Sequence, residues 1–529
     1  MRLRVLLVFC GLFLCVRSLL RTDAEYWTTL AKEELKEAIN VELNYGTAKN
    51  VILFVGDGMG PNTVTAARIY KGGETHRLCF EKFPHMGLLK TYAANKMVPD
   101  SACSATALFC GIKANKDTMG VDATVKRKDC DASLSPTARP LCLAGLALKS
   151  GKSAGLVTTM RVTHATPGAL YAHSADRSWE CEAKMPIGTE CKDIARQLTE
   201  DWPGMDLNVV MGGGMQGLMF NSSSSPEDPK DTYGCIRMDG RDLIKTYIND
   251  KTQRNLKYSI VRNNQELKSL KVKKTDYLLG IFANGHLSYE HERNQGPEGM
   301  PSLADMVKAA IRVLRKNKNG YFLMVEGGNI DMAHHRSWAK RAVTETAAME
   351  AAVDLALNMT NSQDTLLIVT SDHTHTMAIN GYPNRGSDIF GASERSYVDG
   401  INYTVLSYTT GGPLAYQYEV VSENNKSVVK RKDPTMDNQQ KYDYVYQAGI
   451  QLTENVHGGG DVAIYASGPH AHLFHNVHEQ HYVYHAIAYA AKMGNYDISN
   501  GIHWHAHTTL STCVLVTTLH VLLWFYRGS

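Results

Sequence analysis

Short runs of β-branched and aliphatic residues alternate along most of this chain with longer stretches of helical character. Such alternation favours parallel strands, because each intervening helix returns the chain to the same edge of the sheet. We therefore predict an α/β fold around a large, mostly parallel central sheet. The predicted strands lie at residues 50–55, 153–158, 207–211, 277–282, 321–325, 365–370 and 461–465.

Two segments depart from this alternation. Residues 380–456 are rich in Tyr, Asn, Ser and Gly and contain few long apolar runs, so we interpret them as an inserted surface subdomain. Residues 25–44 have helical character with an apolar stripe. That stripe would pack either on a partner subunit or on the chain's own core, and the sequence leaves both alternatives open.

Both ends of the chain carry patterns typical of export and anchoring signals. Residues 1–22 begin with a basic segment and continue with an apolar run too short to cross a bilayer, which predicts a signal peptide. Small residues at 499–501, a spacer and an apolar run at 510–526 predict a GPI-anchor signal over residues 500–529, with Ser499 or Asn500 as the attachment residue. A C-terminal membrane helix is the alternative, but His520 interrupts a run that is already short for one.

The composition agrees with an exported protein at the extracellular face of the plasma membrane. Removing both end segments takes away five arginines and no acids, so the net charge of +3 falls to about −2, and nucleic acid is not expected as a partner. Eight of the 11 cysteines remain, and several should pair in an oxidising compartment, although their spacing does not fix the pairs. Sequons for N-glycosylation stand at Asn221, Asn358, Asn402 and Asn425.

Acids stand at the ends of three predicted strands. Asp57, Glu326 and the pair Asp372 and His373 follow the strands that begin at residues 50, 321 and 365. Ligands of open α/β sheets gather at the carboxyl ends of the strands. We therefore expect these side chains to meet at one edge of the sheet.

A further acid and two further histidines match metal-ligand spacing. Asp331 and His335 are four residues apart, so a helix that starts near Asp331 would place both side chains on one face. Such a pair alone is more often a surface ion pair, although carboxylate plus imidazole also suits zinc. With His457 the candidate ligands are too many for one zinc, and they fit two ions that stabilise the attacking and leaving oxygens of an in-line displacement. Phosphoryl transfer is therefore the leading predicted reaction.

The candidate nucleophile is a serine at a predicted helix start. Pro99 and Asp100 precede a run of small residues that begins at Ser101. A helix N-terminus favours both an alkoxide and a bound phosphate. An Asp-Ser pair at such a position is more often only a helix cap. Cys103 is the alternative nucleophile, and a buried thiol in an exported protein is the weaker candidate.

With these motifs the chain resembles the alkaline phosphatases of the animal, membrane-anchored type. The matching segments are residues 54–60, 99–102, 163–167, 171–177, 326–328, 330–335, 372–375 and 457–459. They lie within residues 24–493, nearly the whole mature chain. The resemblance implies a three-layer sandwich, with the catalytic domain at residues 23–379 and 457–495 and a small crown-like insertion at residues 380–456.

The resemblance also implies a metal centre of two Zn²⁺ and one Mg²⁺ per subunit. One Zn²⁺ would be held by Asp331, His335 and His457. The second Zn²⁺ would be held by Asp57, Asp372 and His373. The Mg²⁺ would be held by Asp57, Thr166 and Glu326.

Two residues would carry the chemistry that the resemblance implies. Ser101 would form a phosphoserine intermediate, and Arg177 would clamp the phosphate through its planar guanidinium. Asp100, His164 and His375 would support these groups, although an ordinary core histidine is an equally simple interpretation of the last two. The implied reaction hydrolyses phosphate monoesters to an alcohol and inorganic phosphate. A homodimer, attached to the membrane through its GPI anchor, and a disulfide between Cys130 and Cys191 are implied in the same way.

Four residues depart from the family pattern. Met332 stands where the vertebrate enzymes carry histidine, so we expect a water contact on the phosphate side to be missing. Cys103 replaces a glycine, adds a side chain next to the helix start and is expected to crowd the site. Ala283 and Met300 stand where vertebrate relatives have acidic calcium ligands, so no vertebrate-type Ca²⁺ site is expected.

Two other functions compete with the implied one. Related two-zinc folds act as phosphodiesterases or pyrophosphatases, but they usually lack the arrangement of Arg177 and magnesium. A catalytically silent, anchored surface protein is a different class of alternative. All candidate ligands, Ser101 and Arg177 are present, which favours an active phosphatase.

Overall fold

The computed structural model describes residues 23–494 of the chain. The predicted signal peptide, the anchor signal and its attachment residue lie outside the described residues. The chain divides into two units, one ending at Asn44 and the other beginning at Tyr45, and each is described by itself. In the first unit the predicted helix is present as α2 (Ala24–Ile39).

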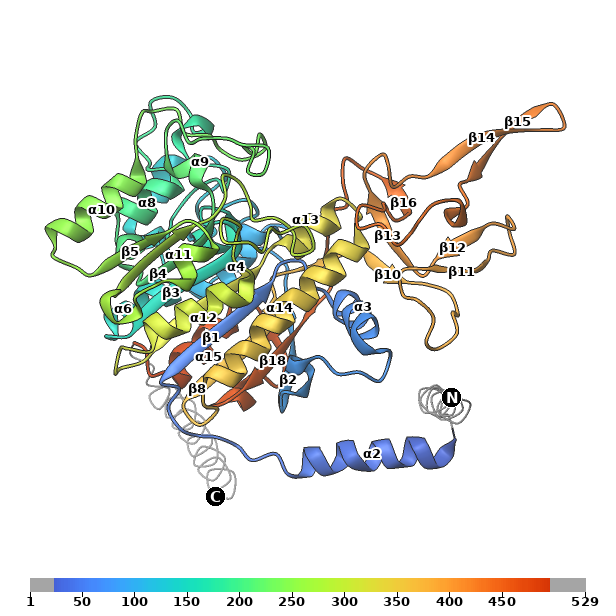
Figure 1. The fold of residues 1–529 in the computed structure, drawn as a ribbon, viewed down its shortest axis with the longest axis horizontal. Coiled ribbons are helices and arrows are strands. Elements are labelled where there is room, and N and C mark those ends of the chain that lie inside the picture. Colours follow the sequence, from blue (N-terminus) through green and yellow to red (C-terminus); the bar gives the residue numbers. More distant parts are fainter. Residues whose placement is uncertain (1–22, 495–529) are drawn as a thin grey trace, which may run out of the picture. The chain divides into compact units, whose positions relative to one another are not determined.

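The second unit is built on a ten-stranded sheet with the strand order β19-β2-β18-β8-β1-β7-β3-β4-β6-β5 (Figure 1). The seven strands from β8 to β5 run parallel, whereas β18 is antiparallel to both β8 and β2. The sheet contains all seven predicted strands, and the predicted α/β fold is confirmed. The strands are β1 (Asn50–Gly56), β2 (His85–Lys90), β3 (Ser153–Arg161), β4 (Val209–Gly213), β5 (Tyr258–Val261), β6 (Tyr277–Ile281), β7 (Tyr321–Gly327), β8 (Thr365–Ser371), β18 (Val462–Ser467) and β19 (Asn476–Glu479).

The helices of the described residues range from single turns to the 21-residue α14. Within residues 23–494, no helix is both long and apolar enough to cross a membrane. The helices of the second unit are α3 (Pro61–Gly72), α4 (Ser101–Cys110), α5 (Cys130–Leu134), α6 (Leu143–Lys149), α7 (Ala165–Ala169), α8 (Ile194–Glu200), α9 (Met215–Leu218), α10 (Leu243–Gln253), α11 (Asn264–Lys268), α12 (Leu303–Leu314), α13 (Asn329–His335), α14 (Ala339–Met359) and α15 (Tyr482–Ala490).

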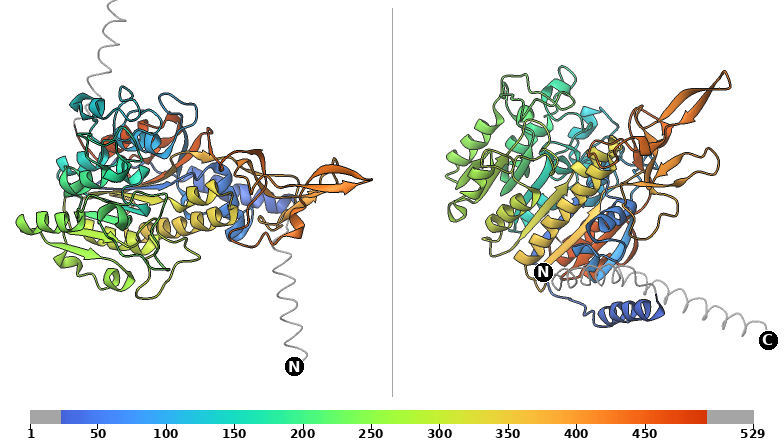
Figure 2. Two further views of the ribbon diagram at one scale, coloured as in Figure 1. Left: turned by 90° about the horizontal axis from the view of Figure 1, so that it is seen from above. Right: turned by 45° about the vertical axis from the view of Figure 1, so that its right-hand side comes forward.

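Strand β1 contributes to two separate hydrophobic cores. Val51, Leu53 and Val55 belong to one core, and Ile52 and Phe54 belong to the other. Helices α4, α6, α8, α10 and α15 pack in the first core, and α3, α12 and α14 pack in the second (Figure 1, Figure 2). Because successive side chains of a strand point to opposite faces, the sheet is the middle layer of a three-layer sandwich.

Three small sheets lie within residues 377–451. β10 (Met377–Ile379), β13 (Leu406–Gly411) and β16 (Ala448–Gln451) form a three-stranded sheet. Two further two-stranded sheets are formed by β11 (Ala392–Arg395) with β12 (Asn402–Thr404), and by β14 (Tyr418–Glu423) with β15 (Lys426–Arg431). Figure 1 shows them, in orange, projecting beyond the edge of the layered core. The predicted insertion falls in this region, and its status as a separate subdomain stays a prediction.

Candidate metal centre and active site

The candidate site forms where three parallel strands end. β1 lies between β7 and β8, with Val55 opposite both Glu326 and Thr370. Asp57 and Asp372 follow directly after β1 and β8. Their side chains and that of Glu326 are fully buried. The register of the strands therefore brings three acids together out of contact with water.

A glycine turn allows the chain to pass close to this site. Gly58 has a φ of 67°, a left-handed conformation that glycine adopts without strain. Its N–H donates a hydrogen bond to Asp372 Oδ1 at 3.0 Å. A Cβ atom at this position would lie 2.5 Å from His375 Cδ2, so only glycine fits here.

The first group of potential metal ligands consists of Asp331, His335, His375 and His457. Asp331 Oδ2 lies 3.2 Å from His335 Nε2, and Asp331 Oδ1 lies 2.5 Å from His375 Nε2. His457 Nε2 is 3.5 Å from the same Oδ1 atom. Helix α13 supplies Asp331 and His335, whereas the two other histidines are paired across the short strands β9 (Thr374–His375) and β17 (His457–Gly458). One carboxylate and three imidazoles form a typical zinc-binding set.

Each histidine of this group has its second ring nitrogen held by an oxygen. His335 Nδ1 lies 2.8 Å from Asn455 O, and His375 Nδ1 lies 2.6 Å from Asn455 Oδ1. His457 Nδ1 lies 3.0 Å from Pro99 O. Such contacts fix the orientation of a metal-binding imidazole. The sequence analysis missed Asn455, because a loop asparagine carries no recognisable pattern.

The second group, Asp57, Asp331 and His373, lies beside the candidate nucleophile. Ser101 Oγ is 3.2 Å from His373 Nε2 and 3.4 Å from Asp57 Oδ1. His373 Nε2 is also 3.1 Å from Asp372 Oδ2. All of these side chains are buried. The serine hydroxyl is therefore held among potential metal ligands with little access to water.

The third group contains Asp57, His164 and Glu326, and Thr166 lies next to it. Asp57 Oδ2, Thr166 Oγ1 and Glu326 Oε1 are buried without a hydrogen-bond partner in the described part of the chain. The other oxygen of Glu326 accepts a hydrogen bond from Thr158 Oγ1. Buried oxygens without partners are costly, and a hard cation such as Mg²⁺ would satisfy them.

Burial dominates the electrostatics of the site, and repulsion between neighbouring carboxylates adds to it. Burial, reinforced by the charges of Asp372 and Asp331, raises the pKa of Asp57 well above its usual value. Burial also raises the pKa of Glu326 to about 8. Although burial opposes it, the Asp331 carboxylate raises the pKa of His335 to about 9. The protein thus concentrates negative charge that divalent cations would neutralise.

The start of helix α4 is organised around Asp100. Its carboxylate accepts hydrogen bonds from Ala102 N at 3.2 Å and from Cys103 N at 3.4 Å. Arg177 Nη1 donates to Asp100 Oδ2 at 2.9 Å. Although burial opposes it, the guanidinium lowers the pKa of Asp100. Asp100 therefore fixes Arg177 near the helix end where Ser101 stands, and both the helix dipole and the guanidinium favour an anion there.

Comparison with known proteins identifies the family. The profile of the alkaline phosphatase family matches residues 48–493. The chain belongs to the alkaline phosphatase family. It is 44% identical to the tissue-nonspecific alkaline phosphatase of Gallus gallus over 91% of this chain and 92% of that protein. It is 40% identical to the membrane-bound alkaline phosphatase of Bombyx mori over 90% of this chain and 87% of that protein.

A solved alkaline phosphatase structure, that of Thermus thermophilus, shares the fold with a TM-score of 0.59 at 23% identity, covering 87% of this chain and 94% of that chain. Membership of the alkaline phosphatase family confirms the predicted family and the predicted enzyme class, a phosphoric monoester hydrolase. The family also implies divalent metal ions, and the three groups described above are where such ions would bind. The identity and number of the ions, and the role of each site residue, stay predictions.

The structure brings the predicted alkaline phosphatase ligands together, and it adds to what was expected of two other residues. His375 was predicted only as a supporting residue, yet its Nε2 atom lies within the first ligand group. Cys103, which was expected to crowd the site, packs against Ala93 and Ala114, and its effect on turnover stays open. Its Sγ atom contacts Asp100 O at 3.3 Å and does not occur in any of the three ligand groups.

Three disulfides reinforce one part of the chain. Cys130 is bonded to Cys191, the pair implied by the alkaline phosphatase resemblance, and the other bonds are Cys110–Cys142 and Cys181–Cys235. Among the described residues, the free cysteines are Cys79 and Cys103. The sequon residues Asn221, Asn358 and Asn425 are exposed and Asn402 is half-buried, while glycosylation itself stays a prediction. Absence of the vertebrate-type Ca²⁺ site also stays a prediction.

Proposed function

We propose that this chain hydrolyses phosphate monoesters through a phosphoserine intermediate on Ser101, with two Zn²⁺ and one Mg²⁺ per subunit. The observation that carries the proposal is the position of Ser101. Its hydroxyl lies at the start of α4, 3.2 Å from His373 Nε2, beside three groups of potential metal ligands. A serine that is only a helix cap would not need this surrounding set of buried acids and histidines.

The donor set fits the proposed ions. One Zn²⁺ would be held by Asp331, His335 and His457, with His375 close to the same carboxylate. The second Zn²⁺ would be held by Asp57, Asp372 and His373, which meet beside Ser101. The Mg²⁺ would be held by Asp57, Thr166 and Glu326, whose unpartnered oxygens form a hard, acidic cradle. When bound, the ions would act as Lewis acids that stabilise negative charge on the attacking and leaving oxygens.

The chain's own groups bind and orient the phosphate. Arg177 would hold two phosphate oxygens through its planar guanidinium while Asp100 keeps that guanidinium in place. The α4 dipole would add favourable potential at Ser101. The Ser101 hydroxyl loses its proton to solvent and its oxygen forms a bond to phosphorus, while the bond from phosphorus to the alcohol oxygen breaks and that oxygen takes up a proton. The oxygen of a water molecule then forms a bond to phosphorus as the bond between Ser101 and phosphorus breaks, Ser101 regains a proton, and inorganic phosphate leaves.

The test is phosphate release from phenyl phosphate across pH, with Ser101→Ala beside the wild type. We expect turnover to rise toward alkaline pH and to fall at least about 10³-fold in Ser101→Ala. Circular dichroism and the metal content of the variant must match the wild type. A correctly folded, metal-loaded wild type without turnover would refute the proposed function and favour a silent surface protein.

We also propose that the mature protein is a glycosylated homodimer, held at the extracellular face of the plasma membrane by a GPI anchor. The sequence patterns at both ends and the relative described as membrane-bound support this proposal. Release of activity from cells by a phosphatidylinositol-specific phospholipase would test the anchor. Light scattering of the released protein, with and without residues 24–44, would test the dimer. Activity that remains with the membrane after this treatment would refute the GPI anchor and favour a membrane helix.

A further inference from the structure

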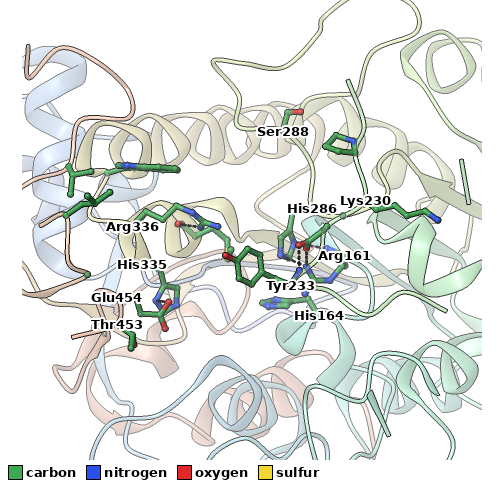
Figure 3. Close-up of a pocket in the computed structure, with 18 of the residues that line it drawn as sticks. Arg161, His164, Lys230, Tyr233, His286, Ser288, His335, Arg336, Thr453 and Glu454 are labelled. Atoms are coloured by element: carbon green, nitrogen blue, oxygen red, sulfur yellow. Dashed lines mark hydrogen bonds and ion pairs between the residues drawn. The ribbon is translucent and has the colours of Figure 1, made fainter. Parts of the chain in front are cut away.

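A cavity of 860 Å³ opens beside the first group of potential metal ligands (Figure 3). His335 of that group lines it, and so does His164 of the third group. Most of the remaining wall comes from the turn between α13 and α14 and from loops at residues 227–233, 285–288, 412–415 and 453–454. In the proposed reaction, the ion held by Asp331, His335 and His457 would be the one that stabilises the leaving oxygen. The remainder of the leaving group would therefore extend into this cavity.

Tyr233 projects an aromatic ring into the cavity. Its side chain is 89% exposed, and Figure 3 shows the ring between Arg336 and Arg161. The backbone beneath the ring is fixed, because Asp231 accepts a hydrogen bond from Tyr233 N at 2.9 Å and pairs with the buried Arg161 at 2.6 Å. An exposed ring on a fixed loop offers a stacking surface at a small cost in conformational entropy.

Arg336 supplies an uncompensated positive charge on the same wall. Its Nη1 atom donates to Met332 O at 2.8 Å, and its guanidinium lies 5.4 Å from the centre of the Trp338 ring. Within residues 23–494 it has no carboxylate at ion-pair distance, unlike Arg161, which pairs with two acids. Because Arg336 directly follows His335, this free charge stands next to the metal centre.

The acids on the cavity wall are partly committed elsewhere. Asp231 is neutralised by Arg161, and Asp228 accepts a hydrogen bond from Asn284 N at 2.8 Å. Glu454 Oε2 lies 3.7 Å from His335 Nδ1, the ring nitrogen that faces away from Asp331, and the Glu454 side chain stays more than half exposed. Glu227 is the remaining acid of the wall, and it is exposed. Comparing substrates whose leaving groups are neutral, negative or positive will therefore show which charge the cavity favours.

We propose that Tyr233 and Arg336 form a leaving-group subsite that favours phosphate monoesters in which the leaving group joins an aromatic ring to a negative charge. The inference rests on the proposed phosphatase function and deepens it. The ring would stack on Tyr233, and the anion would meet the guanidinium of Arg336. Neither residue takes part in the phosphoryl transfer, so the subsite acts through kcat/KM for particular substrates.

The experiment compares four substrates in the metal-loaded full-length enzyme. They are glycerol 1-phosphate, phenyl phosphate, 4-carboxyphenyl phosphate and 4-(aminomethyl)phenyl phosphate. Each variant is judged by ratios of kcat/KM between substrates, since intrinsic leaving-group reactivity cancels when a ratio is compared across enzymes. We expect Arg336→Gln to lower the ratio of the carboxyphenyl to the phenyl ester about three- to tenfold. Arg336→Lys should retain part of that ratio.

Tyr233→Leu tests the ring independently of the charge. We expect it to lower the ratio of the phenyl ester to glycerol 1-phosphate about two- to tenfold. Tyr397→Leu and Arg395→Gln are matched controls, because both residues are exposed and neither lines the cavity. These controls should leave both ratios at their wild-type values.

Two outcomes would overturn the subsite. One is that Tyr233→Leu leaves the ratio of the phenyl ester to glycerol 1-phosphate unchanged and Arg336→Gln leaves the ratio of the carboxyphenyl to the phenyl ester unchanged. The other is a ratio of the carboxy ester to the aminomethyl ester that is the same in Arg336→Gln as in the wild type, which would show that the guanidinium does not select the charge of the leaving group. Both outcomes require an enzyme that hydrolyses phenyl phosphate. Failure of the wild type to hydrolyse any of the four esters would instead refute the proposed function, so the two failures are distinguishable.

Discussion

The metal centre and helix α14 both bury carboxylates, but they neutralise them differently. In the centre, Asp57 and Glu326 are fully buried among further acids, with oxygens that have no partner in the described residues. On α14, Glu345 is only 5% exposed and accepts a hydrogen bond from Glu290 N at 2.6 Å, without an ion pair in the described part of the chain. Burial raises the pKa of Glu345 to about 8, so this carboxyl group carries a proton at neutral pH. A lone buried acid can thus be neutralised by a proton, whereas clustered acids at strand ends are suited to metal ions.

The comparison is tested most strongly by removing the metal ions. We expect dialysis against a chelator to lower turnover at least about 10³-fold, because the Lewis acids are lost. The midpoint of thermal unfolding should fall by about 10 °C or more, since carboxylate repulsion is no longer compensated. Zn²⁺ and Mg²⁺ together should restore both quantities. Full turnover in protein shown by elemental analysis to be metal-free would contradict the assignment.

Asp57→Asn should change stability in opposite directions with and without metal. In the metal-free protein the substitution removes one charge from a repelling group, so the free energy of unfolding should rise by about 1 to 3 kcal/mol. In the metal-loaded protein it removes a proposed ligand, so metal affinity should fall by about 100-fold or more, and both turnover and the free energy of unfolding should fall with it. Denaturant unfolding with and without chelator measures both signs. Asp443→Asn, at an exposed position, is the control. If Asp57→Asn changes the free energy of unfolding in the same direction with and without metal, the comparison is wrong.

Glu345→Gln tests the acid that is neutralised by a proton. The folded-state pKa of Glu345 is raised, so the stability of the wild type should decline as pH rises from the usual glutamate value toward 8. Glutamine keeps an oxygen that can accept from Glu290 N but cannot ionise. At pH 8 or above the variant should therefore be more stable by about 2 to 4 kcal/mol. If the free energy of unfolding changes with pH in the same way in both metal-loaded proteins, Glu345 is ionised in the folded state at no energetic cost, and the prediction is wrong.

Glu350, on the same helix, should show a smaller effect of opposite sign. Although burial opposes it, Lys71 lowers the pKa of Glu350 by donating to its carboxylate. Its contribution to stability is therefore present above the usual glutamate pKa and is lost as pH falls through the lowered folded-state pKa. We expect Glu350→Gln to destabilise the protein at pH 7 by less than about 1 kcal/mol, because the pair is partly exposed. Unfolding at pH 7 and at pH 3 measures the difference, and a stabilised variant at pH 7 would contradict the prediction.

The sequence predicts the central strands well because strands that are buried on both faces consist almost entirely of apolar residues. The segment at residues 321–325 is uniformly apolar, and both faces of β7 are covered in the structure. Three strands were missed, namely β2, β5 and β19. β5 and β19 are the edge strands of the sheet and only four residues long, and β19 contains a single aliphatic residue, Val477. Short strands at the rim are therefore harder to recognise than the long apolar strands of the middle.

The candidate site is predictable to different degrees from the residues alone. Asp57 and Glu326 could be placed together because the ends of parallel strands share an edge. Arg177 could not, because its position depends on a contact with Asp100 across 77 residues, and a loop arginine has no distinctive pattern. The cavity was also not predicted, because loops distant in sequence meet there. Site residues at the ends of regular strands can therefore be predicted from a single sequence, whereas a pocket formed by loops cannot.

The disulfides have a consequence for the order in which the protein matures. All six bonded cysteines lie between Cys110 and Cys235, and the loops that they close overlap. In a chain that enters an oxidising compartment N-terminus first, every partner has arrived before Glu326 or His457 emerges. Covalent locking of this segment therefore does not depend on completion of the metal centre. Oxidation and metal loading would then be separable events, and withholding metal ions should leave a chain that is already cross-linked and lacks only its ions.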